Sequence, residues 1–246
     1  MTWQLRFRRV LSLILILCVD SVLADDDTFL QPHSASYEAH ISHGLSLDGE
    51  AQRELVQQED GSWFYRFNVD TTPAEITEQS VFDLIDRKIR PKSYDYLLSG
   101  FLIKDRHQSV VFDQNTGTLN EKYKKKQWSL DTLPGTLDRL NYQLQLQLDV
   151  GAGKQDLVYQ VIHKGKFREY RFQILGKESI DTKLGTKEAI VVEKVRDGGK
   201  QRETKLWFDQ SAPFALLKMI QTEPDGEYYE INITELRASD TASSDK

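Results

Sequence analysis

The residues of this chain that could carry out chemistry are histidines, carboxylates and hydroxyls, and their spacing matches no catalytic motif. Five histidines are present, and His40 and His43 come nearest to a metal-binding pair. On a strand, however, a spacing of three residues places two side chains on opposite faces. No Gly-x-Ser-x-Gly elbow, His-Glu-x-x-His helix or Walker-type loop occurs in the sequence. We therefore expect no metal site, no cofactor and no enzymatic activity.

The charge of the chain argues against one class of partner. The formal net charge is −6 at pH 7, and residues 1–24 contain three arginines and one aspartate, so their removal makes the chain more acidic. Affinity for nucleic acid comes mostly from neutralising phosphates with basic side chains, and we expect no nucleic-acid partner. Acidic pairs such as Asp48 with Glu50 and Asp83 with Asp86 are interpreted as solvated surface, because spacing alone provides no cleft between two acids.

The first 24 residues have the pattern of a secretory signal peptide. Three arginines precede an apolar run at residues 10–19, and Val22 and Ala24 supply the small residues of a cleavage site. The apolar run is shorter than the roughly 20 residues that span a bilayer. We predict cleavage after Ala24, rather than an uncleaved anchor or a lipoprotein. Cleavage also removes Cys18, the one cysteine, and with it any disulfide or thiolate nucleophile.

The body of the chain has the alternation of apolar and polar residues that β-strands require. Five segments show it, at residues 36–42, 63–69, 157–161, 170–174 and 229–234. Turn sequences with glycine separate such segments, as at residues 59–61, 115–117, 163–166, 197–200 and 225–226. Many short strands joined by tight turns predict a mainly β fold, either a single curled antiparallel sheet or a half-open β-barrel.

One segment has a helical period instead. Leu137, Leu140, Leu144 and Leu148 recur at helical spacing, and Thr136 is a plausible N-cap residue before them. A strand is the competing interpretation, because apolar and polar residues also alternate over residues 144–150. We favour the helix, since Leu, Gln and Arg are good helix formers. A lone helix among strands is expected to cover the concave face of the sheet. The predicted organisation is therefore a signal peptide at 1–24, one mainly β domain at 25–237 and a disordered polar tail at 238–246.

Several short segments also carry a family resemblance. They are Tyr37-Glu38-Ala39, Ile89-Arg90-Pro91 with Tyr94 and Tyr96, Val111-Phe112-Asp113, Asp138-Arg139-Leu140, Leu184-Gly185-Thr186, and Trp207-Phe208 with Pro213. In this order they resemble the bacterial secreted family called domain of unknown function 3108 (DUF3108). The resemblance implies a periplasmic, mainly β protein of the cell envelope. The family has no established activity, so the resemblance implies no catalytic residues.

Secretion, β-periodicity, a single helix and the lack of a catalytic motif lead to one main hypothesis. We expect a non-enzymatic binding or carrier module whose curled sheet encloses an apolar or lipid-like ligand. The side chains expected to line this cavity are Trp63, Tyr65, Phe67, Tyr94, Tyr96 and Leu144. The same side chains would simply form the core if the sheet packs shut.

A basic segment supports the alternative hypothesis. It contains Lys122, Lys124, Lys125, Lys126 and Trp128. A row of lysines protects an exposed sheet edge from unwanted pairing, or it binds a partner surface. In the second case the protein would be a structural or assembly factor of the envelope that acts by protein–protein contact. Neither hypothesis makes the mature chain a transmembrane protein.

Overall fold

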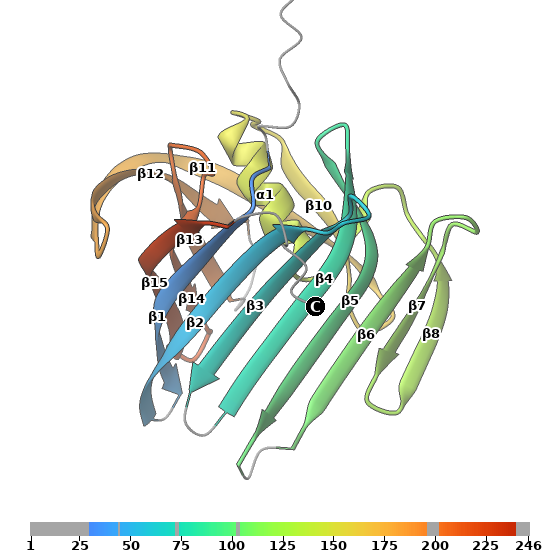
Figure 1. Ribbon diagram of the computed structural model, residues 1–246. Coiled ribbons are helices and arrows are strands. Elements are labelled where there is room, and N and C mark those ends of the chain that lie inside the picture. Colours follow the sequence, from blue (N-terminus) through green and yellow to red (C-terminus); the bar gives the residue numbers. More distant parts are fainter. Residues whose placement is uncertain (1–29, 44, 72–73, 102–103, 196–201, 240–246) are drawn as a thin grey trace, which may run out of the picture.

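The computed structural model describes residues 30–43, 45–71, 74–101, 104–195 and 202–239. Within these ranges the chain forms fifteen strands and one helix (Figure 1). Their bounds are β1 (His33–His43), β2 (Leu45–Gln57), β3 (Trp63–Thr71), β4 (Ala74–Ile85), β5 (Lys88–Gly100), β6 (Arg106–Asp113), β7 (Thr118–Tyr123), β8 (Lys126–Asp131), β9 (Thr136–Leu137), α1 (Asn141–Gly151), β10 (Leu157–Ile162), β11 (Phe167–Thr182), β12 (Gly185–Lys194), β13 (Glu203–Asp209), β14 (Leu216–Thr222) and β15 (Tyr228–Ala238). The predicted signal peptide lies outside the described residues.

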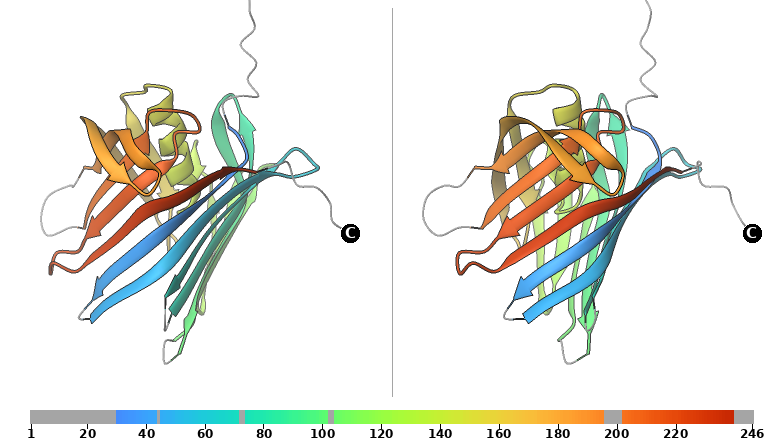
Figure 2. Two further views of the ribbon diagram at one scale, coloured as in Figure 1. Left: turned by 60° about the vertical axis from the view of Figure 1, so that its left-hand side comes forward. Right: turned by 90° about the vertical axis from the view of Figure 1, so that its left-hand side faces the viewer.

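All of these strands belong to one sheet, with the order β8-β7-β6-β5-β4-β3-β2-β1-β15-β14-β13-β12-β11-β10-β9. Neighbouring strands are antiparallel except β9 and β10, which run parallel. Neighbours in the sheet are also neighbours in the chain, except that β1 pairs with β15. The sheet curls on itself but β8 and β9 remain its two edges, so the half-open barrel expected from the sequence is confirmed (Figure 2).

The alternating pattern becomes the two faces of this curl. On β3, for example, Trp63, Tyr65, Phe67 and Val69 are buried on the concave side, whereas the residues between them are more exposed. Buried side chains from nearly every strand, together with those of α1, form one continuous hydrophobic core inside the curl. The core is therefore the interior of the half-barrel.

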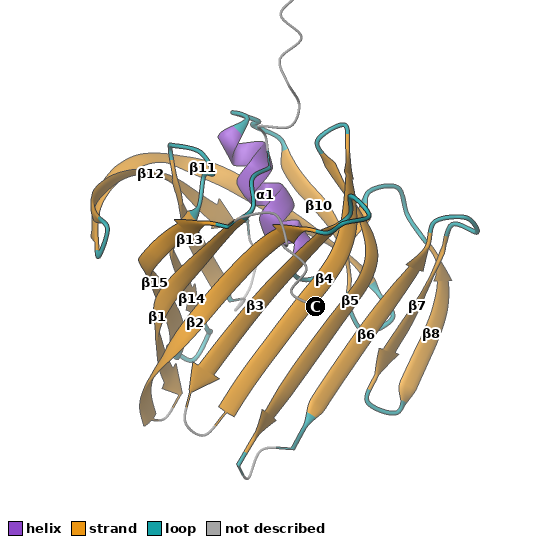
Figure 3. Ribbon diagram, in the orientation of Figure 1, coloured by secondary structure: helices purple, strands orange, loops and turns teal. Residues whose placement is uncertain are grey.

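Helix α1 lies inside the curl, against the concave face of the sheet, where Figure 3 shows it among the strands. Eight of its residues are buried, which is unusual for a helix with a polar side. Two buried glutamines find partners in the surrounding strands and loops. Gln145 accepts a hydrogen bond from the backbone N–H of Ile89 at 2.8 Å, and Gln147 donates one to the carbonyl of Pro213 at 2.9 Å. The helix is thus held at one end of the half-barrel by polar as well as apolar contacts.

The start of the helix differs from the prediction. Thr136 was expected to cap it, but Thr136 and Leu137 form β9 beside β10, and α1 begins at Asn141. The carboxylate of Asp138 takes the capping role, because its Oδ1 accepts hydrogen bonds from the backbone N–H groups of Leu140 and Asn141 at 2.9 and 2.7 Å. The strand interpretation of residues 144–150 is wrong, since all of them belong to α1.

The end of the domain also lies slightly beyond the predicted boundary. Ala238 is the last residue of β15 and pairs with His33, and the backbone N–H of Ser239 donates to the carbonyl of Pro32 at 3.1 Å. The rest of the predicted tail lies outside the described residues. Within the part of the chain that the structure describes, no helix has the length and apolar character needed to cross a membrane.

Candidate functional site

The concave face of β2 to β5 carries three rows of side chains that lie in register across the strands. We name them by their distance from α1. The helix-side row is Leu55, Tyr65, Ser80 and Tyr94. The middle row is Arg53, Phe67, Glu78 and Tyr96. The mouth row is Ala51, Val69, Ile76 and Leu98, and it lies toward the end where β1, β3 and β5 terminate, which we call the mouth (Figure 1).

The helix-side row is completely enclosed. No member of it is more than 2% exposed, and Leu144 of α1 is also fully buried. Polar groups in this layer have partners: Ser80 Oγ donates to Asp138 Oδ2 at 2.8 Å, and the Asn141 amide donates to Ser80 Oγ at 2.7 Å. This half of the interior is part of the hydrophobic core.

The middle row brings charge into the interior. Arg53 donates to the hydroxyl of Tyr65 and to Oε1 of Gln143, both at 2.7 Å, and its guanidinium lies 4.6 Å from the centre of the Phe67 ring. Glu78 accepts a hydrogen bond of 2.6 Å from the hydroxyl of Tyr94. Burial, followed by the charge of Glu78, raises the pKa of Tyr94 well above its ordinary value, so the tyrosine stays a donor.

Arg139 joins this row from the segment that precedes α1. Its guanidinium lies over the Tyr96 ring, 5.3 Å from the ring centre, and the side chain is only partly buried. Burial lowers the pKa of Arg139, but the charge of Glu78 and the surrounding tyrosines outweigh this effect and raise it above the usual value. Arg139 therefore remains charged inside the half-barrel.

Asp138, next to Arg139, is fully buried. Burial raises its pKa to about 6, although hydrogen bonds from the backbone of Asn141 and from Ser80 oppose the shift. The carboxylate receives four hydrogen bonds, from Leu140 N, Asn141 N, Asn141 Nδ2 and Ser80 Oγ. These bonds engage Asp138 with the start of the helix and with β4.

The mouth row is apolar, and it is less enclosed than the other two. Ala51 and Val69 are buried, but Ile76 and Leu98 are only half-buried although they face the concave side. Along β4 and β5 the burial of inward side chains therefore decreases with distance from α1. Figure 2 shows the corresponding divergence of the strands at this end. An apolar surface that faces inward yet contacts solvent has the character of a ligand-binding wall.

Strand β7 and the turn between β10 and β11, each next to an edge strand of the sheet, approach each other through a side-chain contact. Glu121 of β7 is fully buried, and its carboxylate accepts hydrogen bonds from the backbone N–H groups of Lys164 and Gly165, each at 2.6 Å. These two residues form the turn between β10 and β11. Gln108 also donates to Glu121, at 2.7 Å. A buried carboxylate thus bridges the opening of the half-barrel in place of a backbone ladder.

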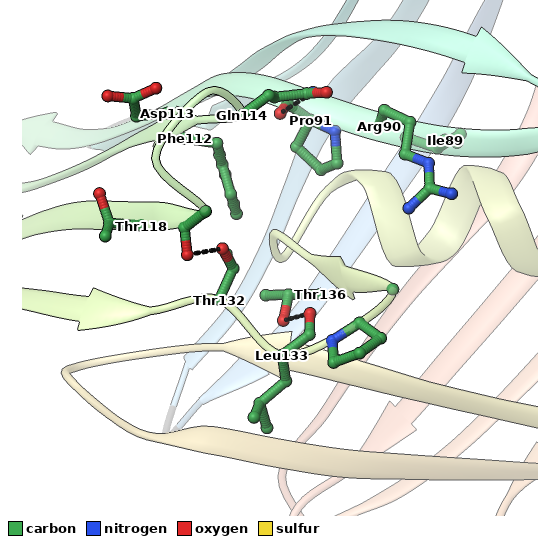
Figure 4. Close-up of a pocket in the computed structure, with 13 residues that line it drawn as sticks. Ile89, Arg90, Pro91, Phe112, Asp113, Gln114, Thr118, Thr132, Leu133 and Thr136 are labelled. Atoms are coloured by element: carbon green, nitrogen blue, oxygen red, sulfur yellow. Dashed lines mark hydrogen bonds between the residues drawn. The ribbon is translucent and has the colours of Figure 1, made fainter.

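A small surface cleft of about 250 Å³ lies close to the same opening. Its walls come from the start of β5, the turn between β6 and β7, and the segment that joins β8 to β9 (Figure 4). Pro91, Phe112 and Asp113 contribute to it, so two segments that carry the family resemblance meet here. Gln114 donates to the carbonyl of Pro91 at 3.2 Å, and Thr136 donates to that of Leu133 at 2.7 Å. The side chains of Gln114 and Thr136 therefore form hydrogen bonds with other residues that line the cleft.

The six residues expected to line a cavity are brought together on the inner face, but they divide between two environments. Trp63, Tyr65, Tyr94 and Leu144 are buried in the filled half of the interior. Phe67 and Tyr96 lie in the middle row, nearer the mouth. None of the six contributes to the surface cleft. Whether any of them touches a ligand remains a prediction.

The basic segment forms the hairpin of β7 and β8. Lys122, Lys124, Lys125 and Lys126 are exposed there, and β8 is an edge of the sheet, which supports the interpretation as edge protection. Trp128 does not join them. It lies opposite Glu121 in the ladder and is partly buried against the turn at Gly165, so it is less exposed than the lysines, and its part in a binding surface stays a prediction.

Two histidines on the sheet surface each lie beside an aspartate. His40 lies 2.7 Å from Asp48, and His107 lies 2.9 Å from Asp95, both on exposed strand surfaces. Among the described residues, no three His, Cys, Asp or Glu side chains are grouped so that they could hold a metal ion.

Two residues of the middle row, Arg53 and Glu78, were not among the site residues predicted from the sequence. Arg53 alternates with Ala51 and Leu55, a period of two that directs it inward with them. Its charge argued for the surface and concealed this signal. Arg139 was noted only as part of a family segment, because its position over Tyr96 depends on how the chain enters α1.

The chain belongs to the DUF3108 family. The family described as "Protein of unknown function (DUF3108)" matches residues 36–234, which is most of the chain and nearly all of the described domain. This confirms the resemblance found in the sequence. Curated proteins offer no match to the chain.

Solved structures match the chain at low sequence identity. A beta-barrel-like protein of the DUF1849 family from Brucella abortus is 13% identical, with a TM-score of 0.57, and the match covers 86% of this chain and 99% of that one. The MucA/MucB complex of Pseudomonas aeruginosa matches at 11% identity and a TM-score of 0.38, over 89% of this chain and 55% of that one. A putative outer membrane lipoprotein-sorting protein domain from Vibrio parahaemolyticus matches at 11% identity and a TM-score of 0.23, over 87% of this chain and 87% of that one. The first match establishes a beta-barrel-like fold, and the other two are too weak to support an argument.

Proposed function

We propose that this protein is a non-enzymatic binding module of the cell envelope that holds an apolar or lipid-like ligand at the mouth of its half-barrel. The observation that supports this function is the gradient of burial along β4 and β5. Ser80 and Tyr94 are fully enclosed near α1, whereas Ile76 and Leu98 are apolar, directed inward and partly exposed. Exposed apolar surface costs free energy in water, about 25 cal/mol per Å², and a ligand that covers it recovers this cost.

The predicted signal peptide supports a periplasmic location for this function. A carrier or sensor of apolar molecules is useful in an aqueous compartment between two membranes. The half-open sheet supports this function, since α1 fills one end of the interior and the inward side chains Ile76 and Leu98 toward the other end are less enclosed. Fold alone does not define a ligand, so the proposal rests on the mouth row.

The test uses two adjacent residues that face opposite sides of β5. Leu98 lies in the mouth row, whereas Leu97 lies on the outer face with 41% of its surface exposed. The neutral fluorescent dye N-phenyl-1-naphthylamine should bind the secreted wild-type protein. Leu98→Glu should weaken this binding at least about tenfold, because the carboxylate would lose hydration beneath the ligand. Leu97→Glu should leave it unchanged. Absence of dye binding, or equal effects of the two variants, would refute the proposal.

The exposed lysine hairpin favours a second function, an assembly factor that contacts another envelope protein. Lys124, Lys125 and Lys126 lie together at the tip of the β7–β8 hairpin and the start of the edge strand β8. Replacement of all three by Glu should abolish a specific crosslink formed in cells, because it reverses the charge of the surface. An unchanged crosslinking pattern would exclude this version and leave the lysines with edge protection alone.

A further inference from the structure

The charges of the middle row are poorly matched. Two guanidinium groups, Arg53 and Arg139, act on the single carboxylate of Glu78 in this row. A buried or half-buried charge is costly unless it is paired and hydrogen-bonded. Asp138 is also close, but its carboxylate already receives four hydrogen bonds at the start of α1. The interior therefore offers more guanidinium donors than its own acceptors take up.

Arg53 shows the imbalance directly. Its two hydrogen bonds go to neutral oxygens, those of Tyr65 and Gln143. Its Nε is buried and has no partner among the described residues. Water does not readily replace the partner, because the residue is only 4% exposed. Unpartnered buried donors are rare in native proteins and call for an explanation. A missing acceptor is the simplest one.

Arg139 has still fewer partners. Within the described part of the chain its guanidinium contacts the face of Tyr96 and donates no hydrogen bond to a carboxylate or a carbonyl. On the outer surface, Arg171 and Arg237 each form an ion pair with a glutamate on their own strand. The outward-facing Arg66 instead contacts the ring of Phe64, and its Nε is also buried without a partner among the described residues. An arginine can donate five hydrogen bonds and matches planar anions with two at once. Arg139 is only partly buried, so its N–H groups are not closed off from solvent.

The position of these donors relative to the apolar wall defines the shape of the ligand. The middle and mouth rows are two residues apart on each strand, a distance of about 7 Å. An anionic group at Arg139 would therefore place an attached hydrocarbon chain over Val69, Ile76 and Leu98 on its way to the mouth. A molecule with one acidic head and an apolar tail satisfies both surfaces.

We infer that the half-barrel binds an acidic amphiphile head-first, with the carboxylate or phosphate of its headgroup held by Arg139 and with Arg53 behind it. This inference rests on the proposed binding function and specifies the chemical class of the ligand. It also gives the Arg139–Tyr96 pair a role, since the ring holds the guanidinium in place while leaving its N–H groups available.

Displacement of N-phenyl-1-naphthylamine from the secreted wild-type protein tests the inference without any mutation. The competitors are hexadecanoic acid, hexadecan-1-ol, butanoate and inorganic phosphate. Hexadecanoate should bind at least about tenfold more tightly than the alcohol, because charge-assisted hydrogen bonds are added. Butanoate and phosphate should compete weakly. Equal binding of acid and alcohol would overturn the inference but leave the binding function intact. Binding of neither, together with no dye binding, would overturn the function itself.

Variants then locate the acidic headgroup. Arg139→Gln should reduce the preference for the acid over the alcohol about tenfold, and Arg139→Lys should retain most of it. The matched control is Arg66→Gln, since Arg66 lies on β3 between two inward residues but faces outward. Thermal unfolding establishes that each variant is folded. An unchanged preference in folded Arg139→Gln would overturn the assignment, as would inorganic phosphate that competes as well as hexadecanoate, which would indicate a site for a free anion.

Discussion

The two ends of the interior are built from the same strands and the same alternation, yet they differ in what lies opposite the sheet. At the helix end, Tyr65 and Tyr94 face α1 and are fully enclosed. At the mouth, Ile76 and Leu98 face inward but remain partly exposed. Period-two patterning therefore determines which side chains point inward, whereas a second element determines whether they become core. The helix end should consequently dominate stability, and the mouth should dominate binding.

The largest effect should follow from a cavity at the helix end. Leu144 is fully buried between α1 and the sheet, so Leu144→Ala should lower the free energy of unfolding by about 3 to 5 kcal/mol, through lost burial and the cavity left behind. Denaturation in urea measures this. Leu97→Ala, on the outer face, serves as the control and should cost far less. A loss below about 1 kcal/mol for Leu144→Ala would break the comparison.

The next effect concerns Asp138. Burial raises the pKa of this aspartate to about 6. Between the ordinary pKa of an aspartate and this value, the folded state keeps a proton that the unfolded state releases. The stabilising contribution is thus complete below about pH 4 and is lost as the pH rises to about 6, amounting to about 3 kcal/mol. Asp138→Asn should remove this loss, so its stability relative to wild type should increase from pH 4 to pH 6.

Comparison of variant and wild type at each pH is necessary because His163 acts in the opposite direction. Burial, followed by the charge of Arg139, lowers the pKa of His163 to about 3. This neutral histidine contributes stability above the ordinary histidine pKa that is lost as the pH falls, and its effect cancels in the difference between the two proteins. A difference that does not change with pH would show that Asp138 is ionised throughout the range.

A smaller effect is expected at Glu121, the carboxylate that joins β7 to the β10–β11 turn. Glu121 lies in register with Tyr94 of the helix-side row, through Val110 of β6. Glu121→Gln keeps the size of the side chain but removes the charge that accepts from the backbone of Lys164 and Gly165. We expect a loss of about 2 kcal/mol in urea denaturation, together with faster amide hydrogen exchange in the β10–β11 turn. Unaltered exchange in that turn would indicate that Glu121 does not hold β7 and the turn together.

The smallest effect on stability should come from the mouth. Leu98→Ala truncates a side chain that is only half-buried, so the free energy of unfolding should fall by less than about 1 kcal/mol. Dye affinity should fall several-fold in the same variant, because the apolar wall is smaller. A stability loss close to that of Leu144→Ala would mean that the mouth is core after all.

The parts of the structure that follow from local pattern were predictable from the sequence. Alternation identified β3 and β10, glycine marked the turns at Gly61 and Gly117, and leucine spacing identified α1. Features that depend on partners distant in the chain were not. Burial of Gln145 becomes acceptable only because Ile89 supplies a donor, and the capping of α1 passes from Thr136 to Asp138 because β10 draws Thr136 into the sheet. Recognising the inward arginines depends on both kinds of information: Arg53 follows the local alternation, whereas the position of Arg139 depends on how the chain enters α1.

The pairing of β1 with β15 has a consequence for how the chain acquires its fold. Apart from this pair, each half of the sheet is a local meander in which successive segments find one another at low contact order. The centre of the sheet joins β1 to β15, so it cannot form until β15 has been synthesised. Before then, β1 presents a bare backbone edge of eleven residues, which is the kind of surface that promotes aggregation. Export, which the signal sequence at residues 1–24 predicts, would therefore require β1 to stay unfolded or protected until β15 has also crossed the membrane.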